Sequence, residues 1–284
     1  MHPGAIVLVV SAAVAHAGWN LFAKRVPDGG ALFVWLAAAW GVLFQLPVAL
    51  YLVVRNGMPG VWWVAFAVSG VIHLGYFVLL QRGYRVGDLS VVYPLARGTG
   101  PLISVIAAVW LLGERPGVAA LLGAAAVIGG VLVIGGLGSG SGSGWAGGVG
   151  YGLATGSLIA TYTLWDAHAV TALAVPPVIL MAGSALVETV LLAPYVAMRR
   201  AQTVAIWRNN RVAVLTVAVL SPLAYVLVLF AMRLAPVSLV APARELSIVI
   251  GSLGAWLLLG EPNPVRRLTG SVIVLAGVAA IAVS

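Results

Sequence analysis

The sequence contains no cysteine and very little charge. The absence of cysteine from its 284 residues excludes a disulfide framework, iron–sulfur ligation and a thiol nucleophile. Charged residues make up only 8%, against roughly 25% in an ordinary soluble domain, whereas hydrophobic residues make up 62%. So little polar surface cannot keep a globule in water. The composition therefore indicates a chain that is solvated by a lipid bilayer.

Catalytic and nucleic-acid-binding patterns are also missing. The sequence has no HExxH, no Walker loop, no GxSxG and no histidine–carboxylate cluster at metal-ligand spacing. Its formal charge of +8 comes from arginines and lysines that occur singly or in pairs between apolar runs, as topology signals do. We therefore expect no enzyme, no cofactor, no metal and no nucleic-acid partner, with an intramembrane enzyme only a distant alternative.

Apolar runs divide the chain into ten segments, each long enough to cross about 30 Å of hydrocarbon as a helix. Breaks at glycine, proline and charge predict spans at 3–23, 31–54, 60–80, 89–112, 117–137, 145–165, 174–198, 212–232, 236–259 and 268–283. The first run lacks a basic leader and a cleavage site, so we expect a spanning helix there rather than a signal peptide. Alternation at period two is absent, which favours helices over a barrel. The predicted fold class is an all-α, multi-pass protein of the cell (plasma or inner) membrane.

The chain is one five-span unit written twice. A shift of about 147 positions aligns Trp19-Asn20 with Trp165-Asp166, Pro47 with Pro194, Arg97 with Arg244, Gly113-Glu114 with Gly260-Glu261, and Gly123 and Gly130 with Gly270 and Gly277. Residues 138–144, GSGSGSG, form a predicted flexible linker between the repeats 1–137 and 145–284. Five is an odd number, so the second half enters the membrane with opposite polarity. Inverted repeats around a central site are typical of secondary transporters.

Four charged residues lie deep inside predicted spans: Arg97, Glu188, Arg244 and Glu245. Each costs around 2.5 to 3.5 kcal/mol near the bilayer centre, so each needs a partner or a function. Arg97 and Arg244 lie roughly 12 to 14 Å into their spans, close to the midplane. Each follows a proline, which frees a backbone carbonyl and kinks the helix beside the cation. We expect a binding site at this level.

The alternative is that Arg244 serves only as an ion-pair partner of Glu245 or Glu188. Adjacent residues on a helix point about 100° apart, which disfavours a pair between Arg244 and Glu245. Three other acidic residues, Asp88, Glu114 and Glu261, lie at span ends. For these we expect solvation or pairing with Arg115, and no chemistry.

Spans one and six each present a polar, aromatic face. His16, Trp19 and Asn20 share one face, and Tyr162, Trp165 and Asp166 repeat the same spacing in the second half. For the tryptophans alone, an interfacial belt is the commoner explanation, because each lies near a predicted span end. His16 is either a hydrogen-bonded core residue or a proton-titrating group. His73 and Tyr76 in span three and Tyr225 in span eight are further site candidates.

Glycine spacing predicts close helix packing. Gly144, Gly148, Gly152 and Gly156 recur every four residues at the start of span six, and spans five and ten each carry two glycines seven residues apart. Packing within one chain explains these seams. A homodimer through spans five and ten is the alternative.

Basic loop residues predict the orientation. One side would carry three of them, Arg55, Arg115 and Arg233. The other would carry ten: Lys24, Arg25, Arg82, Arg85, Arg199, Arg200, Arg208, Arg211, Arg266 and Arg267. The positive-inside rule places the ten in the cytoplasm and both termini outside.

Several motifs resemble the drug/metabolite transporter superfamily, specifically its ten-helix EamA-like branch. They are AHAGWNLFAKR (15–25), GDLSVVYPLARGTGP (87–101), LLGE (111–114), YTLWDAHAV (162–170), VAPAREL (240–246) and LLLGE (257–261). HAGWN and AREL are similar to a subgroup that includes membrane proteins associated with phosphonate use. The resemblance implies a basket of ten helices in which spans three, four, eight and nine line a cavity for small polar metabolites. It also implies that Tyr93, Arg97, Arg244 and Glu245 line this cavity. Many relatives place both termini in the cytoplasm, contrary to the basic loops here.

The sequence thus predicts a proton-coupled or exchange-type secondary transporter of a small anionic or zwitterionic metabolite, resembling an amino acid or a phosphonate. Arg97 and Arg244 would hold its acidic group through charge-assisted bonds. Glu245 or Asp166 would hold an amine or carry the coupling proton, because a carboxylate in a low-dielectric cavity takes up a proton readily; Glu188 and His16 are further proton-coupling candidates. The alternatives are a flippase for a charged lipid precursor and a non-transporting scaffold or sensor.

Overall fold

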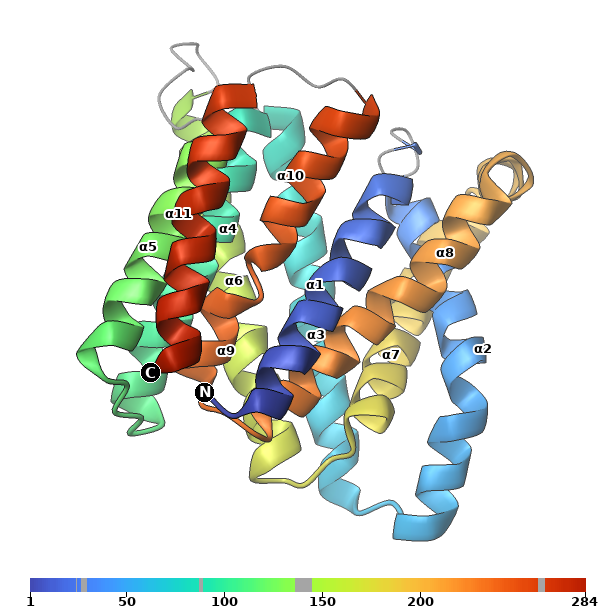
Figure 1. Cartoon of the computed structure of the whole chain (residues 1–284). Coiled ribbons are helices and arrows are strands. Elements are labelled where there is room, and N and C mark those ends of the chain that lie inside the picture. Colours follow the sequence, from blue (N-terminus) through green and yellow to red (C-terminus); the bar gives the residue numbers. More distant parts are fainter. Residues whose placement is uncertain (24, 27–29, 87–88, 136–144, 260–263) are drawn as a thin grey trace.

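A computed structural model describes the chain except residues 24, 27–29, 87–88, 136–144 and 260–263. Over the described residues, all regular secondary structure is helical (Figure 1). The predicted linker 138–144 and the acidic residues Asp88 and Glu261 lie outside the described residues. The helices of the first half are α1 (Pro3–Ala23), α2 (Gly30–Asn56), α3 (Gly60–Val86), α4 (Leu89–Leu111) and α5 (Val118–Gly135). Those of the second half are α6 (Trp145–Thr171), α7 (Pro177–Ala197), α8 (Arg200–Met232), α9 (Val237–Ala243), α10 (Leu246–Leu259) and α11 (Pro264–Val283).

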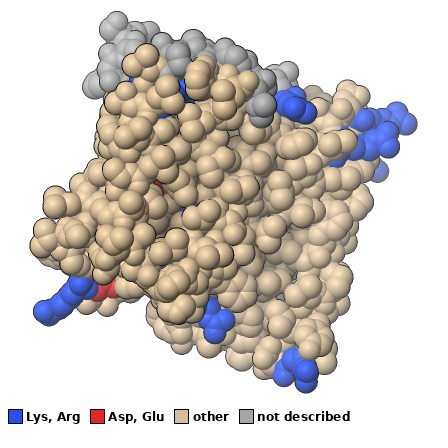
Figure 2. Space-filling model, in the orientation of Figure 1, with Lys and Arg blue, Asp and Glu red and all other residues tan. Residues whose placement is uncertain are grey.

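The surface is that of a protein embedded in a bilayer. Eight helical segments of the described chain are long and apolar enough to cross a membrane, and the apolar α5 is shorter. Large hydrophobic side chains such as Val54 and Trp110 are more than four-fifths exposed. Figure 2 shows Lys and Arg gathered toward the two ends of the molecule, with a broad band between them whose surface carries almost no charge. The chain is therefore an all-α membrane protein, as its composition predicts.

The helix contacts follow the inverted repeat. If α1, α2, α3 and α5 are exchanged with α6, α7, α8 and α11, the packing of α1 on α8 becomes the packing of α6 on α3. The pairs α2–α7 and α5–α11 map onto themselves. Chain termini lie at the same end of the molecule (Figure 1), where the Met1 backbone nitrogen donates to the Ala282 carbonyl oxygen at 3.0 Å. Two halves of opposite polarity thus share one bundle.

The glycine seams of α5 and α11 meet inside the chain. A Cβ added at Gly123 would lie 2.7 Å from the Gly277 carbonyl oxygen, and one added at Gly130 would lie 2.8 Å from that of Gly270. On α6, a Cβ at Gly152 would lie 2.8 Å from the Leu95 Cβ of α4. These seams are therefore intramolecular, and the idea that those of spans five and ten form a homodimer contact is wrong. The space beside these glycines is already occupied by helices of the other half of the same chain.

Span nine departs most from its predicted form, a single helix over 236–259. Two helices, α9 and α10, replace it, separated at Arg244 and Glu245. At this break the Glu245 N–H donates to the carbonyl oxygen of Pro242 and the Ile248 N–H to that of Glu245, three residues back in both cases. Because Pro242 has no N–H of its own and restricts the preceding turn, the helix tightens here and changes direction. Span four keeps one helix through both of its prolines.

Other boundaries differ by several residues. Helix α8 begins at Arg200, but Asn210 interrupts it with non-helical angles, so its spanning part begins near the predicted residue 212. Helix α6 continues to Thr171, six residues past the predicted end of span six. Trp165 therefore lies inside the helix, where its indole N–H donates to the Ala65 carbonyl oxygen of α3 at 2.8 Å. This contact joins the two halves and satisfies the Trp165 indole N–H inside the bundle.

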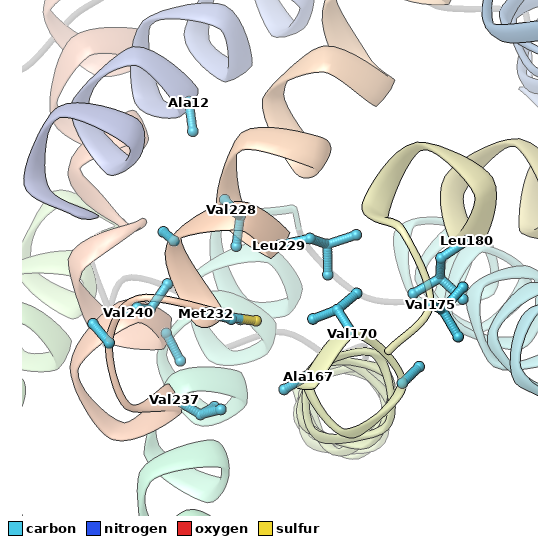
Figure 3. Close-up of a cluster of buried hydrophobic side chains, with 14 of the residues drawn as sticks. Ala12, Ala167, Val170, Val175, Leu180, Val228, Leu229, Met232, Val237 and Val240 are labelled. Carbon is cyan, nitrogen blue, oxygen red and sulfur yellow. The ribbon is translucent and has the colours of Figure 1, made fainter. Parts of the chain in front are cut away.

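An apolar cluster fills the bundle near the end that carries the termini. Ala12, Val170, Val228, Leu229 and Val240 are among its buried members, contributed by α1, α6, α8 and α9 (Figure 3). Helix α7 closes the cluster with Leu180. These side chains lie between the middle of the bundle and the termini, so the polar residues at the level of Arg244 are sealed off on that side.

Candidate functional site

Two arginines, one from each half, converge on one carboxylate. Arg97 comes from the middle of α4, and Arg244 and Glu245 form the break between α9 and α10. The Arg97 Nε lies 3.2 Å from Glu245 Oε2, and the Arg244 Nε lies 3.4 Å from Glu245 Oε1. All three side chains are nearly or fully buried, at 11%, 9% and 1% exposed. The two arginines that are equivalent in the repeat therefore contact the same carboxylate.

The Arg244–Glu245 contact corrects the expectation that a pair between these adjacent residues is disfavoured. That expectation assumed an uninterrupted helix, whereas the chain bends at these two residues and both side chains are long enough to turn toward each other. No ion pair joins Arg244 to Glu188 among the described residues, so the other suggested partner is wrong. Glu188 lies half-buried on α7.

The hydrogen bonding of this cluster is incomplete. Arg97 Nε and Glu245 Oε2 are close, yet neither atom has a well-directed hydrogen bond, and Arg244 Nη2 has no acceptor among the described residues. Two guanidiniums against one carboxylate also leave one positive charge in excess. Buried polar groups are normally satisfied, and an exception calls for an explanation. Guanidinium N–H groups without an acceptor can donate hydrogen bonds to a second anion.

The repeat supplies each arginine with an aromatic neighbour at the same relative position. Arg97 Nη2 lies 3.4 Å from Nε2 of His16 on α1, and it donates to the Ser247 hydroxyl at 3.3 Å. Since guanidinium can only donate, His16 Nε2 accepts here. In the second half Tyr162, the counterpart of His16, lies under Arg244, with the guanidinium carbon 5.8 Å from the ring centre. Each arginine is thus positioned by span one or six of its own half.

A second polar cluster adjoins the first through Tyr162. Its ring stacks on His73 of α3, with centroids 4.1 Å apart and planes at 26°. The Tyr225 hydroxyl donates to Asp166 Oδ2 at 2.7 Å, and His73 Nε2 lies 3.9 Å from the same oxygen. Asp166 is fully buried, and its Oδ1 has no partner among the described residues. The sequence reasoning had named all four residues without predicting that they meet.

A small cavity of about 50 Å³ lies between the two clusters. Its polar lining consists of His16, Arg97, Tyr162, Tyr225, Arg244 and Ser247. Ala12, Ala13, Ala224 and Val228 supply the apolar part, and two of these, Ala12 and Val228, also belong to the apolar cluster toward the termini. The volume holds a few waters at most, whereas ligand pockets usually measure about 300 to 1,000 Å³.

Other predicted site residues lie around the cavity without lining it. The Trp19 ring meets His16 edge-on at 4.9 Å, and the Asn20 amide donates to the His16 carbonyl oxygen of its own helix. Tyr76 contacts the Tyr162 ring at 5.8 Å. Tyr93, which the family resemblance places in the cavity wall, is 36% exposed on α4 and is absent from the cavity lining.

Two contributors escaped sequence analysis. Ser247 was missed because serine is common in membrane spans, although its place three residues after Arg244 was a usable signal. Glu114 was expected to be solvated or paired with Arg115. Instead its carboxylate accepts hydrogen bonds from the N–H groups of Val237 and Ser238, both at 2.9 Å, and so caps the first turn of α9. No group of three potential metal ligands occurs in the described part of the chain.

Comparisons with known proteins agree with this architecture. Residues 3–136 and 146–283 each match the EamA-like transporter family. A solved structure, named only as "Crystal structure of protein", is 16% identical and aligns over 100% of this chain and 98% of its own with a TM-score of 0.78. At that identity the likeness shows the fold alone. No curated protein matches the chain.

Proposed function

The chain belongs to the EamA-like transporter family, a family of membrane transporters, and from this premise we propose that it is a secondary transporter of a small anionic or zwitterionic metabolite. Arg97 and Arg244 bind the acidic group of the substrate. The observation that carries this proposal is the convergence of two buried arginines, one per half, on a single carboxylate beside a cavity. A site shared by both halves is the arrangement that alternating access requires.

The position of Glu245 supports an acidic substrate. Its carboxylate lies between the two guanidiniums, where the carboxylate or phosphonate of a substrate would also be held. Substrate therefore competes with Glu245 for the arginines, and Glu245 is released to meet a substrate amine or to accept a proton. An amino-acid-like or phosphonate-like molecule has the matching charges. Planar guanidinium groups hold such oxyanions with two parallel bonds.

Coupling to protons is supported by the geometry of His73 and Asp166. The His73 Nδ1 lies 2.9 Å from the Ser69 carbonyl oxygen, which can only accept, so Nδ1 carries a proton. The other ring nitrogen, Nε2, faces Asp166 Oδ2 at 3.9 Å. Asp166 Oδ2 thus lies close to an imidazole nitrogen and accepts from the Tyr225 hydroxyl, surroundings in which a buried carboxylate can exchange a proton. Because Tyr225, whose hydroxyl donates to Asp166, also lines the cavity beside Arg97 and Arg244, Asp166 is the coupling residue in this proposal, with Glu245 as its competitor for that role.

The small cavity implies that substrate binds to a different conformation of the protein. Binding must separate Glu245 from at least one arginine and enlarge a space of about 50 Å³. The break between α9 and α10 provides the hinge, because Arg244 and Glu245 lie within it.

Arginine-to-lysine variants test the binding role. Amino acids, phosphonates, sugar phosphates and amines are first screened by thermal shift on the purified protein, since ligand at a hundredfold its Kd stabilises by about 2.7 kcal/mol. With a hit, Arg97→Lys and Arg244→Lys should each fold yet lose most counterflow in proteoliposomes, because lysine keeps the charge but not the planar fork. Arg115→Lys, at the exposed end, is the matched control. Full activity of both variants contradicts the proposal. An imposed proton gradient in the same assay separates proton coupling from exchange.

A non-transporting scaffold or sensor is the second candidate. It is favoured by the pairing of both arginines with Glu245 and by the small size of the cavity. Such a protein would show neither ligand stabilisation nor counterflow with any compound of the screen. Its arginines would matter for folding only, so lysine variants would lose stability and no other property.

A further inference from the structure

A second basic site lies far from the central cavity, at the end of the molecule opposite the termini. It is a cleft of about 340 Å³ between the end of α1 and the beginning of α8. Its lining includes three arginines, Arg25, Arg208 and Arg211, together with Phe22 and the amides of Asn209 and Asn210. We propose that this cleft binds the phosphate of an anionic phospholipid headgroup.

Two of the three arginines flank the kink in α8. Asn210 has φ −131° and ψ 28°, outside the helical range, and its amide donates to the Ile206 carbonyl oxygen at 3.2 Å. Arg208 and Arg211 lie on either side of this interruption, and both line the cleft. From the other wall, Arg25 extends over the Phe22 ring at 5.1 Å. Two guanidiniums from α8 and one from the turn after α1 thus line the same cleft.

Nothing acidic neutralises this cleft among the described residues. Arg25, Arg208 and Arg211 form no ion pair with a described carboxylate, and the lining contains only basic, amide and apolar side chains. In the central cluster, by contrast, Glu245 offsets the two arginines. Three exposed guanidiniums without an ion pair in the described part of the chain, beside amide donors, match the oxygen atoms of a phosphate group.

The position of the cleft at the expected membrane interface favours a lipid headgroup as its ligand. The apolar length of α1 ends at Ala23 and that of α8 begins at Val212, so the cleft lies where hydrocarbon gives way to headgroups. Trp207 stacks on Trp40 of α2 beside it, with ring centres 5.2 Å apart and planes at 17°. Tryptophan at this level is typical of the membrane interface, and basic pockets between helices there bind anionic headgroups.

A headgroup in this cleft would join the two halves. Arg25 belongs to the first half, and Arg208 and Arg211 belong to the second, so one phosphate contacts both. Since the halves must move relative to each other during transport, the lipid would favour the conformation in which α1 and α8 are together. This site is independent of the substrate site and stands whether or not the central cavity transports.

Lipid-binding measurements on the full-length protein test the proposal. The probe is phosphatidylglycerol, with phosphatidylcholine as the neutral lipid, and bound lipids are counted by native mass spectrometry from detergent. The variant Arg25→Gln/Arg208→Gln/Arg211→Gln should bind phosphatidylglycerol roughly tenfold more weakly than wild type. Arg55→Gln/Arg115→Gln/Arg233→Gln, which removes the same charge from the opposite end, should bind as wild type does. Single substitutions at Arg208 and Arg211 should give intermediate losses and guard against misfolding of the triple variant.

Three outcomes overturn the proposal. Equal loss in both triple variants means that net charge, and not the cleft, attracts the lipid. Binding of millimolar inorganic phosphate to wild type but not to the cleft variant, with equal phosphatidylglycerol binding in both, means that the cleft is a site for a free anion and not for a headgroup. If the cleft variant keeps its preference for phosphatidylglycerol, the cleft is not the site that selects this lipid.

Discussion

Glu245 carries more of the central site than any other single residue. It is 1% exposed and lies within 3.4 Å of both guanidiniums. Removing one partner of a buried ion pair leaves the remaining charge without compensation, which costs far more than the net value of the pair. Here one substitution would leave two arginines uncompensated. A binding role and a structural role therefore coincide at this position and need separate readouts.

The first residue-scale prediction is that Glu245→Gln destabilises the protein by about 3 to 5 kcal/mol, because two buried guanidiniums lose their anion. Combining it with Arg97→Met should restore part of the loss, since the pair is then removed as a unit. Denaturant or thermal unfolding in detergent measures both. The control is Glu188→Gln, whose carboxylate has no ion pair among the described residues. Additive losses in the double variant would show that Arg97 and Glu245 are not coupled.

The sequence was sufficient to find these residues but not their contacts. A charge deep in an apolar run is visible without a structure, and the repeat shows that Arg97 and Arg244 share one level. The contact of Arg244 with Glu245 was not predictable, because it depends on a helix break that proline permits but does not require, as α4 demonstrates. The family resemblance placed Tyr93 in the cavity wall, but it does not line the cavity, although it lies on the same helix as Arg97.

At the scale of the element, α9 depends on a residue distant in sequence. This seven-residue helix lies before the break that carries Arg244, and it is too short to be stable alone. Glu114, in the loop after α4, accepts hydrogen bonds from the N–H groups of Val237 and Ser238 in the first turn of α9. A carboxylate there satisfies two free donors and complements the helix dipole. The loop after span four thus fixes the position of span nine.

We predict that Glu114→Ala lowers the stability of the protein by about 1 to 2 kcal/mol, the usual range for loss of a helix cap. Hydrogen exchange measured by mass spectrometry should localise the increased opening to residues 237–243. The matched control is the exposed neighbour, Arg115→Ala, which should change neither quantity. Unchanged exchange in α9 after loss of Glu114 would mean that packing alone holds this helix.

Close helix packing gives a second element-scale prediction. An alanine Cβ at Gly123 would meet the Gly277 carbonyl oxygen at 2.7 Å, so α5 and α11 must separate, at a cost of about 1 to 3 kcal/mol. Gly129 lies on the same helix with nothing within 4 Å of such a Cβ, and alanine there should be neutral or stabilising. Thermal unfolding of Gly123→Ala and Gly129→Ala compares the two. Equal melting temperatures would contradict the tight contact.

Most helix positions were predictable because glycine, proline and charge mark where apolar runs end. The differences arose where tertiary packing overrides these marks. Helix α6 passes its predicted end because Trp165 and Asp166 are held by α3 and α8, so polar side chains that would otherwise end a span are satisfied inside the bundle. The kink at Asn210 separates an interfacial segment from a spanning one, which hydropathy alone records only as a change in composition.

For the molecule as a whole, the inverted repeat fixes which loops share a side but not which side is the cytoplasm. The termini and the loops with Arg55, Arg115 and Arg233 lie at one end, and the basic cleft with Arg25, Arg208 and Arg211 lies at the other. Basic residues near span ends are retained in the cytoplasm, and by sequence ten of the loop lysines and arginines belong to the end opposite the termini, against three at the same end. The anionic cytoplasmic leaflet would also supply the lipid proposed for the cleft.

We therefore predict that both termini lie outside the cytoplasm. Alkaline phosphatase fused after Ser284 should be active and green fluorescent protein at the same position dark, because the first folds only outside the cytoplasm and the second only inside. A phosphatase fusion after Arg199, between α7 and α8 at the opposite end, should be inactive and serves as the control. The reverse pattern at both positions would place the basic cleft outside the cell, against the charge rule, and would give the chain the orientation common among its relatives. In that orientation, the apolar cluster near the termini would close the cytoplasmic side of the central cavity instead of the outer side.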